Sequence, residues 1–283
     1  AVIAGTTSCD DFLDREPMSS ISPETYYSTA AQLEANLNDE YPNVLPSFGQ
    51  WTYGIFGEDK GTDNQIEVNA NDRYTQDRWK VPHSESDNWK FERIYRINFF
   101  LSEALPKFGE DMSGSQNTIS GSVATIKHYI GEMYFLRAYE YFKKLQLFGD
   151  FPIIDQPLAD EMEALREASK RFPRNEVARF IISDLDKAYA YMSDVDMATT
   201  RINKDAAMLV KSRVALFEAT WLQNFKGTAF VPGGEGWPGA SLHNNYQYPS
   251  GNLDNEVKYF LEQAVEASKL VADKYKGNLT ENT

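Results

Sequence analysis

The sequence has a single cysteine, few basic side chains and no long apolar run, and each shortage excludes a class of protein. One cysteine in 283 residues cannot pair within the chain, which excludes a disulfide scaffold. The chain has 28 lysine and arginine residues against 42 aspartate and glutamate residues, a net charge of -14. This argues against a nucleic-acid-binding protein, because clusters of cations neutralise phosphates. No apolar run reaches the length of about 18 residues that a membrane-spanning helix needs.

Motifs for catalysis and metal binding are also missing. His83, His128 and His243 lie far apart, without the His-Glu-x-x-His or Cys-x-x-Cys spacing of a zinc site. There is no Gly-x-x-x-x-Gly-Lys phosphate loop and no Gly-x-Ser-x-Gly turn. We therefore expect no metal, no cofactor and no enzymatic activity. A glycan-cleaving enzyme stays open as an alternative, because a catalytic carboxylate pair leaves no local signature.

What is present begins with an unusual N-terminus. Residues 1–9, Ala-Val-Ile-Ala-Gly-Thr-Thr-Ser-Cys, are small and uncharged, and a charged segment follows. Small residues before a cysteine are typical of the end of a signal peptide. We expect residues 1–8 to be the remaining tail of such a peptide, Cys9 to carry a lipid and residues 9–21 to form a tether. The alternative is an ordinary terminus with a free thiol.

Apolar residues recur at helical spacing through most of the remaining chain. The pattern predicts six helices, over residues 22–41, 87–105, 122–148, 175–192, 204–221 and 254–275. The third helix is apolar around most of its circumference, which predicts a place in the middle of a bundle. Because strand-like alternation is almost absent, we expect an all-α fold. Helices three and four, and helices five and six, are expected to pack as antiparallel pairs, as in tetratricopeptide solenoids.

Capping residues and prolines predict where these helices end. Ser22 followed by Pro23 suits the start of the first helix. Pro42 is expected to close that helix, and Pro106 the second, because proline lacks the N–H that continues a helix. Gly149 suits the left-handed position after the third helix.

Two long stretches, residues 42–86 and 223–253, do not fit into helices. Both contain many aromatic residues, and because disordered segments are poor in aromatics we expect ordered surface loops. An exposed ring offers a flat apolar face to a sugar, while nearby Asp, Asn and Gln side chains can bond its hydroxyl groups. The first loop has both features, and its glycan-binding candidates are Trp51, Tyr53, Asp63, Asn64, Tyr74 and Trp79. The alternative is that these rings only pin a long loop to the helices.

Four stretches of the sequence resemble one known family. They are Ser8-Cys9-Asp10-Asp11-Phe12-Leu13-Asp14 with Pro17; Trp89 with Tyr95, Ile97 and Asn98; Phe135-Leu136-Arg137-Ala138-Tyr139-x-Tyr141-Phe142 closed by Leu147-Phe148-Gly149-Asp150-Phe151-Pro152; and Ile182-x-Asp184-Leu185-x-x-Ala188 followed by Ala206-Ala207, Ala215 and Trp221. In this order they cover nearly the whole chain. Together they resemble the N-terminal part of the SusD/RagB family of outer-membrane lipoproteins from Bacteroidota.

The resemblance implies both a fold and a function. Members of the family have tetratricopeptide-like helix pairs with long irregular loops, and they are not enzymes. By resemblance, residues 22–283 form a SusD-like helical domain, and Cys9 anchors it to the outer membrane by lipid alone, facing the cell surface. The implied role is to capture an oligosaccharide and deliver it to a SusC-type TonB-dependent transporter. Some branches bind peptides instead, and a helical-repeat adaptor for other proteins is a further alternative.

Three departures from the family pattern limit what carries over. Thr6-Thr7-Ser8 differs from the leucine-led sequence that usually precedes a lipidated cysteine. Members of the family are usually much longer, so we expect the chain to stop before the C-terminal half, which supplies part of the binding face. Ligand residues of the family are not fixed by a motif. The six glycan-binding candidates therefore depend on the loop argument alone.

Overall fold

The fold is built from helices. The computed structural model describes residues 26–46, 88–109, 111–193, 197 and 200–277. Its elements are α3 (Ala30–Val44), α4 (Glu92–Phe108), α5 (Val123–Phe148), α6 (Met162–Ala168), α7 (Arg174–Tyr191), α8 (Lys204–Asn224), the 3-10 helix η3 (Pro238–Ser241) and α9 (Leu253–Tyr275). These ranges contain no β-strand, only the isolated bridges Thr29 with Ser120 and Phe151 with Phe172. The predicted all-α fold is confirmed.

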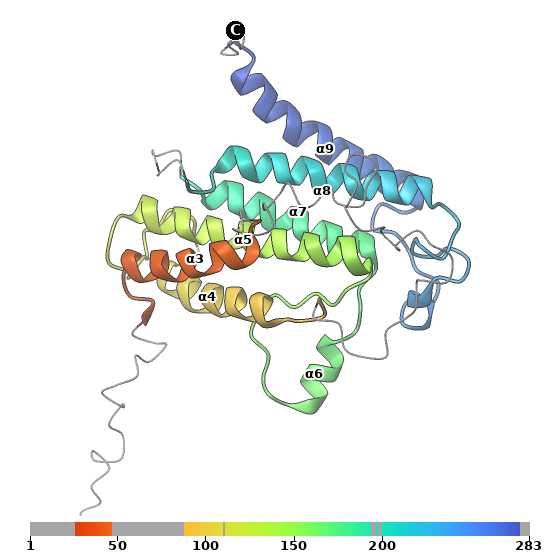
Figure 1. The fold of residues 1–283 in the computed structure, drawn as a ribbon, viewed down its shortest axis with the longest axis horizontal. Helices are drawn as coiled ribbons and strands as arrows, with labels where there is room; N and C mark the ends of the chain where they lie inside the picture. Colours follow the sequence, from red (N-terminus) through yellow and green to blue (C-terminus); the bar gives the residue numbers. More distant parts are fainter. Residues whose placement is uncertain (1–25, 47–87, 110, 194–196, 198–199, 278–283) are drawn as a thin grey trace, which may run out of the picture.

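The helices lie in layers around α5 (Figure 1). On one side α5 contacts α3 and α4, on the other it contacts α7, and α8 lies between α7 and α9. Residues from almost the whole circumference of α5 are buried, as predicted for a central helix. The most extensive helix contacts join α5 with α7 and α8 with α9, so the predicted pairs are confirmed.

Ion pairs at both ends show that α8 and α9 run antiparallel. Lys226, just after α8, contacts Asp254 at the start of α9 with an N–O distance of 2.5 Å. At the other end, Asp205 in the first turn of α8 contacts Lys274 in the last turn of α9 at 2.7 Å. Between them, the hydroxyl of Ser212 donates to the carbonyl of Ala264.

The structure corrects where the first two helices stop. The N-cap of α3 is Thr29, whose side chain accepts the N–H of Gln32; the predicted start at Ser22 lies outside the described residues. Pro42 and Pro106 lie inside the last turns of α3 and α4 instead of closing them. A proline in a last turn removes one backbone hydrogen bond. The helices continue past it because the final residues, Val44 and Phe108, are buried in the core.

The other long helices follow the sequence prediction closely. Ser122 caps α5, and Gly149 after it has a φ of 68°, a conformation that favours glycine. Asn203 caps α8 and Asn252 caps α9 through side chains that accept a backbone N–H. The short helix α6 was not predicted. None of its residues is buried, so it has no apolar periodicity to detect.

Buried ion pairs connect the helices across the layers. Each pairs an arginine with a carboxylate from another segment: Arg137 with Asp184, Arg174 with Glu218, Arg179 with Glu256, and Arg201 with Glu132. A buried charge is costly unless it is paired and hydrogen-bonded. These pairs therefore fix which helix faces lie against one another.

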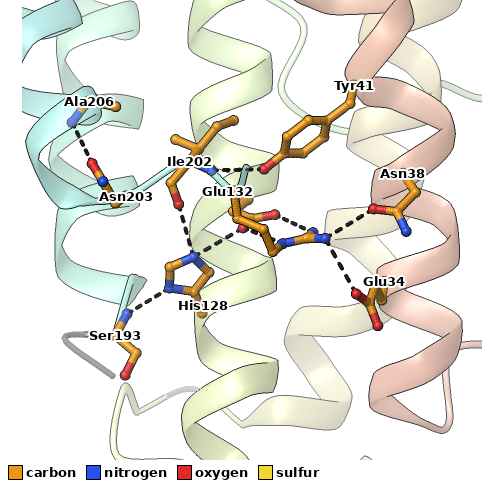
Figure 2. A network of polar contacts seen from close by, with 10 residues as sticks. Glu34, Asn38, Tyr41, His128, Glu132, Ser193, Ile202, Asn203 and Ala206 are labelled. Atoms are coloured by element: carbon orange, nitrogen blue, oxygen red, sulfur yellow. Dashed lines mark hydrogen bonds and ion pairs between the residues drawn. The ribbon is translucent and has the colours of Figure 1, made fainter. Parts of the chain in front are cut away.

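His128 lies beside the ion pair of Arg201 with Glu132, between α5 and the segment before α8 (Figure 2). Its Nδ1 accepts the backbone N–H of Ser193 at 3.2 Å, and its Nε2 lies 3.0 Å from the carbonyl oxygen of Ile202. The same Nε2 is 3.0 Å from Glu132, which also binds Arg201. This arrangement places the imidazole proton on Nε2. His128 is thus a buried structural residue.

Candidate functional site

The residues predicted to bind lipid and glycan lie outside the part of the chain that the structure describes. These are Cys9, Trp51, Tyr53, Asp63, Asn64, Tyr74 and Trp79. The described chain resumes at Asn88, immediately before α4. The described candidates for a site are the second predicted loop and the surface near Asn88.

Aromatic rings in the second predicted loop, residues 225–252 in the structure, hold the loop to the helices. Trp237 is buried, and its Nε1 donates to the carboxylate of Asp150 at 2.7 Å. The hydroxyl of Tyr246 bonds the side chain of Asn175, and that of Tyr248 donates to a loop carbonyl. Trp237 and Tyr246 therefore pin this loop to the helices, whereas Phe230 of the same loop is 61% exposed.

A pocket lies where α4, α6 and the segment that joins α5 to α6 meet. Its volume is about 300 Å³, at the lower end of the range for small-molecule sites. It is lined by Phe91, Ile94, Tyr95, Ile154, Gln156, Leu158, Ala159, Asp160, Leu165 and Ser169. We call it the α4–α6 pocket. Its walls are mainly apolar, with three polar side chains among them.

Tyr95 gives the α4–α6 pocket an exposed aromatic ring. It is 51% exposed, and it stacks on Phe99 one turn later with the ring centres 6.1 Å apart. The neighbouring Ile94 points into the core, so Tyr95 occupies the outward face of α4. An aromatic ring held in this way presents an apolar face beside the polar groups of Gln156, Asp160 and Ser169.

Buried polar side chains hold one wall of the pocket in place. The side chain of Asn98 donates to the carbonyl of Ile154 at 2.8 Å, and Arg137 donates to the carbonyl of Asp155 at 2.9 Å. The hydroxyl of Tyr141 donates to the carbonyl of Ile154 and accepts its N–H. Burial raises the pKa of Tyr141 above its usual range, which keeps this hydroxyl protonated as a donor.

Arg137 is the centre of this support. Its guanidinium makes two hydrogen bonds to Asp184, at 2.7 and 2.8 Å, and a third to the side chain of Asn98 at 2.9 Å. It lies over the rings of Tyr134 and Phe180. Such a bidentate pair fixes orientation as well as charge, so the wall of the pocket is tied to both α4 and α7.

The segment after α5 connects the pocket to the rest of the bundle. Phe151 stacks on Phe91, a pocket residue, and on Phe148, with ring centres 5.1 and 5.7 Å apart. Trp89 meets Phe151 edge-on at 4.8 Å. The carboxylate of Asp150 accepts the first N–H of α7 as well as that of Trp237. The residues that carry the strongest family resemblance therefore build the frame of the site.

Sequence reasoning missed the pocket as a site, although it noted Tyr95 within a family motif. The signal available was a large aromatic residue on the polar face of α4, one position from the apolar stripe through Ile94. The other lining residues come from two segments more than fifty positions further along the chain, and no periodicity connects them to α4.

No group of three or more His, Cys, Asp or Glu side chains among the described residues is arranged to hold a metal ion. His243, like His128, has a structural partner, since its ring bonds the carbonyl of Arg171 at 2.8 Å. Within the same ranges no helix is long and apolar enough to span a bilayer.

Comparison with known proteins identifies one family. The model of the SusD-like family, described as "starch-binding associating with outer membrane", matches residues 11–216. SusD-like protein P2 of Formosa agariphila is 26% identical over 235 residues, which make up 79% of this chain and 43% of the relative. SusD-like protein P25 of the same organism is 25% identical, over 76% of this chain and 41% of the relative. The chain thus spans less than half the length of these relatives.

Solved structures show the same fold. A SusD-like carbohydrate binding protein from Bacteroides vulgatus superposes with a TM-score of 0.52 over 90% of this chain and 47% of its own, at 14% identity. A SusD-like protein from Bacteroides fragilis gives 0.51 over 75% of this chain and 39% of its own, at 22% identity. At these identities the likeness concerns the fold alone.

Proposed function

The chain belongs to the SusD-like family, and on that premise we propose that it binds an oligosaccharide at the α4–α6 pocket and releases it unaltered. The observation that carries this proposal is the exposed ring of Tyr95 beside Gln156, Asp160 and Ser169 in a largely apolar pocket. The negative face of an aromatic ring attracts the slightly positive C–H groups on one face of a sugar. Polar side chains at its edge can bond the hydroxyl groups and so orient the sugar.

Rigidity of the pocket supports binding. One wall is the backbone of Ile154 and Asp155, which Asn98, Arg137 and Tyr141 already hold in the structure. A site that is formed before the ligand arrives loses less entropy on binding. Because this wall is already ordered, no entropic cost of ordering it reduces the binding free energy that the exposed ring provides.

A tyrosine substitution tests the pocket. Replacing Tyr95 by alanine should weaken the binding of an oligosaccharide to which the wild type binds by roughly tenfold, which corresponds to about 1.4 kcal/mol. Tyr275→Ala is the matched control, because Tyr275 is 44% exposed and lies at the end of α9. Binding is measured by calorimetry across a panel of glycans and peptides.

The outcomes separate the candidate functions. Equal affinity of Tyr95→Ala and wild type for the glycan would remove the pocket from the proposal. Saturable binding of peptides and of no glycan would favour the peptide-binding branch. Failure of every small ligand to bind would favour a helical-repeat adaptor, and shortened glycan products after long incubation would reveal an enzyme.

We propose that residues of the first predicted loop complete the binding surface. The described chain resumes at Asn88, three residues before the pocket residue Phe91. Its candidates remain Trp51, Tyr53, Asp63, Asn64, Tyr74 and Trp79. Replacing Trp51 and Trp79 together by alanine should weaken glycan binding further, and an unchanged affinity would remove both from the site.

Location and partner follow from the same family membership as proposals. We propose that Cys9 is lipidated, that the chain faces the cell surface from the outer membrane, and that a SusC-type TonB-dependent transporter receives the bound glycan. Stable anchoring requires more than one acyl chain on such a residue. Cys9→Ala should leave the folded protein in the soluble fraction, and persistent membrane association without the transporter would contradict the anchor. Co-purification of the transporter with wild type tests the partner.

A further inference from the structure

The lining of the α4–α6 pocket is unbalanced in charge. Among the ten described residues that line it, Asp160 is the only charged one, and none of these ten is a lysine, arginine or histidine. A carboxylate or sulfate group that entered this pocket would lose water without gaining a cation. Burying an anion without a partner is costly, and the neighbouring carboxylate of Asp160 would add repulsion.

The segment that carries this wall is acidic as well. Residues 155–169, which include the pocket residues from Gln156 to Ser169 and α6, contain five acidic side chains and one basic side chain. The single cation, Arg166, lies 3.9 Å from Glu163. Lys170, the next residue after this stretch, is paired with Glu167 at 2.5 Å.

Two arginines near the pocket wall already have other partners. Arg137 reaches the carbonyl of Asp155, but its guanidinium also bonds Asp184 and Asn98 and is almost completely buried. Arg171, two residues after the pocket residue Ser169, stacks on Trp89, with 4.6 Å between its guanidinium carbon and the ring centre. Neither is aimed at a ligand in the pocket.

We propose that the α4–α6 pocket selects uncharged sugars and rejects sugars that carry a carboxylate or sulfate group. The inference rests on the proposed glycan-binding function and adds the chemical class of its ligand. The selecting group is Asp160, within the acidic segment 155–169.

The test compares two oligosaccharides of the same length and linkage, one uncharged and one with a uronic acid in place of its neutral sugar. Wild type should bind the uncharged ligand at least about tenfold more tightly. This gap, the ratio of the affinities for the two ligands, should narrow as the salt concentration rises, because the screening length falls from about 10 Å at 0.1 M to about 3 Å at 1 M. Asp160→Lys should narrow the gap by supplying a cation.

Asp273→Lys is the matched control. It makes the same change in net charge on α9, on a residue whose side chain is 56% exposed and far along the chain from the pocket. It should leave the preference of wild type in place. Equal affinity of wild type for the two oligosaccharides, or the same gap in Asp160→Lys as in wild type, would overturn the inference while leaving glycan binding intact. Binding of neither ligand would overturn the proposed function, and the inference with it.

Discussion

Arg137 shows how a single buried residue can serve both stability and the site. It is 3% exposed and joins Asp184 of α7, Asn98 of α4 and the pocket backbone at Asp155. A charge in this position is tolerated only because all of these partners are present. The wall of the pocket and the packing of three helices therefore depend on the same guanidinium.

Removing that guanidinium should be severe. Arg137→Ala removes the bidentate partner of the buried Asp184 and leaves only the looser contact with the 44% exposed Lys187 at 3.7 Å. We expect a loss of about 3–5 kcal/mol in the free energy of unfolding, measured by urea denaturation. Arg166→Ala is the control, since Arg166 is 72% exposed and paired at 3.9 Å, and should change stability by less than about 0.5 kcal/mol. Similar losses in the two variants would contradict the assigned role.

The carboxylate of Glu256 makes the free energy of unfolding depend on pH. Burial alone would raise its pKa, but hydrogen bonds from Arg179, Asn175 and Ser250 outweigh burial, and the pKa is lowered. The folded protein then binds this proton less tightly than the unfolded chain. Glu256 therefore stabilises the fold above the ordinary glutamate pKa of about 4.3, and the contribution is lost as pH falls through the lowered value.

Three other carboxylates act in the opposite direction. Burial raises the pKa values of Glu40, Asp150 and Glu218, so protonation of these groups favours the folded state as pH falls. Glu256→Gln removes the first effect and keeps these three carboxyl groups in place. From pH 6 to pH 3 wild type should lose more stability than Glu256→Gln in urea titrations. Parallel curves for the two proteins would show that Glu256 is not responsible.

At the scale of elements, helices could be predicted wherever a buried face gives apolar residues at helical spacing in the sequence. Each long helix presents an apolar stripe to a neighbour, and the starts predicted at residues 122, 204 and 254 lie within one residue of those in the structure. The sequence could not reveal α6, which buries nothing. It also could not show that Pro42 and Pro106 lie inside helices, because burial of the residues that follow each proline outweighs one lost hydrogen bond.

A glycine inside α5 tests how closely the paired helices approach. A Cβ at Gly131 would lie 2.8 Å from the backbone nitrogen of Met192 and 2.9 Å from the carbonyl oxygen of Ala188. Alanine usually stabilises a helix relative to glycine by about 1 kcal/mol. Here we expect Gly131→Ala to destabilise instead, by about 1–3 kcal/mol, because backbone atoms cannot yield as a side chain would.

The control for this substitution is Gly277→Ala. A Cβ at Gly277 would meet nothing within 4 Å, so its stability should stay within about 0.5 kcal/mol of wild type. Thermal unfolding of both variants gives the comparison. A stabilised Gly131→Ala would mean that α5 and the end of α7 lie further apart than the structure has them.

At the scale of the whole molecule, the fold brings together what the sequence keeps apart. The α4–α6 pocket combines Phe91 and Tyr95 with residues near positions 156 and 165, and the contacts that join them pass through buried Asn98, Arg137 and Tyr141. Pattern reasoning finds such residues as core positions. It cannot tell which exposed side chains they place side by side, because that depends on three-dimensional packing.

Of the two predicted loops, the second lies within the described residues, whereas the six glycan-binding candidates of the first do not. In residues 225–252 the aromatic residues Trp237 and Tyr246 serve the fold, which composition alone could not distinguish from ligand binding. The candidates between Trp51 and Trp79 stay predictions. The stretch from Leu147 to Pro152, which carries part of the family resemblance, builds the junction of α5, α7 and the second loop through Asp150.

The most direct test of glycan binding at the α4–α6 pocket is a crystal structure of the protein with the uncharged oligosaccharide that binds it most tightly. We expect one sugar ring to lie against the face of Tyr95, with hydroxyl groups bonded to Gln156 or Ser169. A well-ordered oligosaccharide bound elsewhere, with Tyr95 still exposed to solvent, would contradict the account.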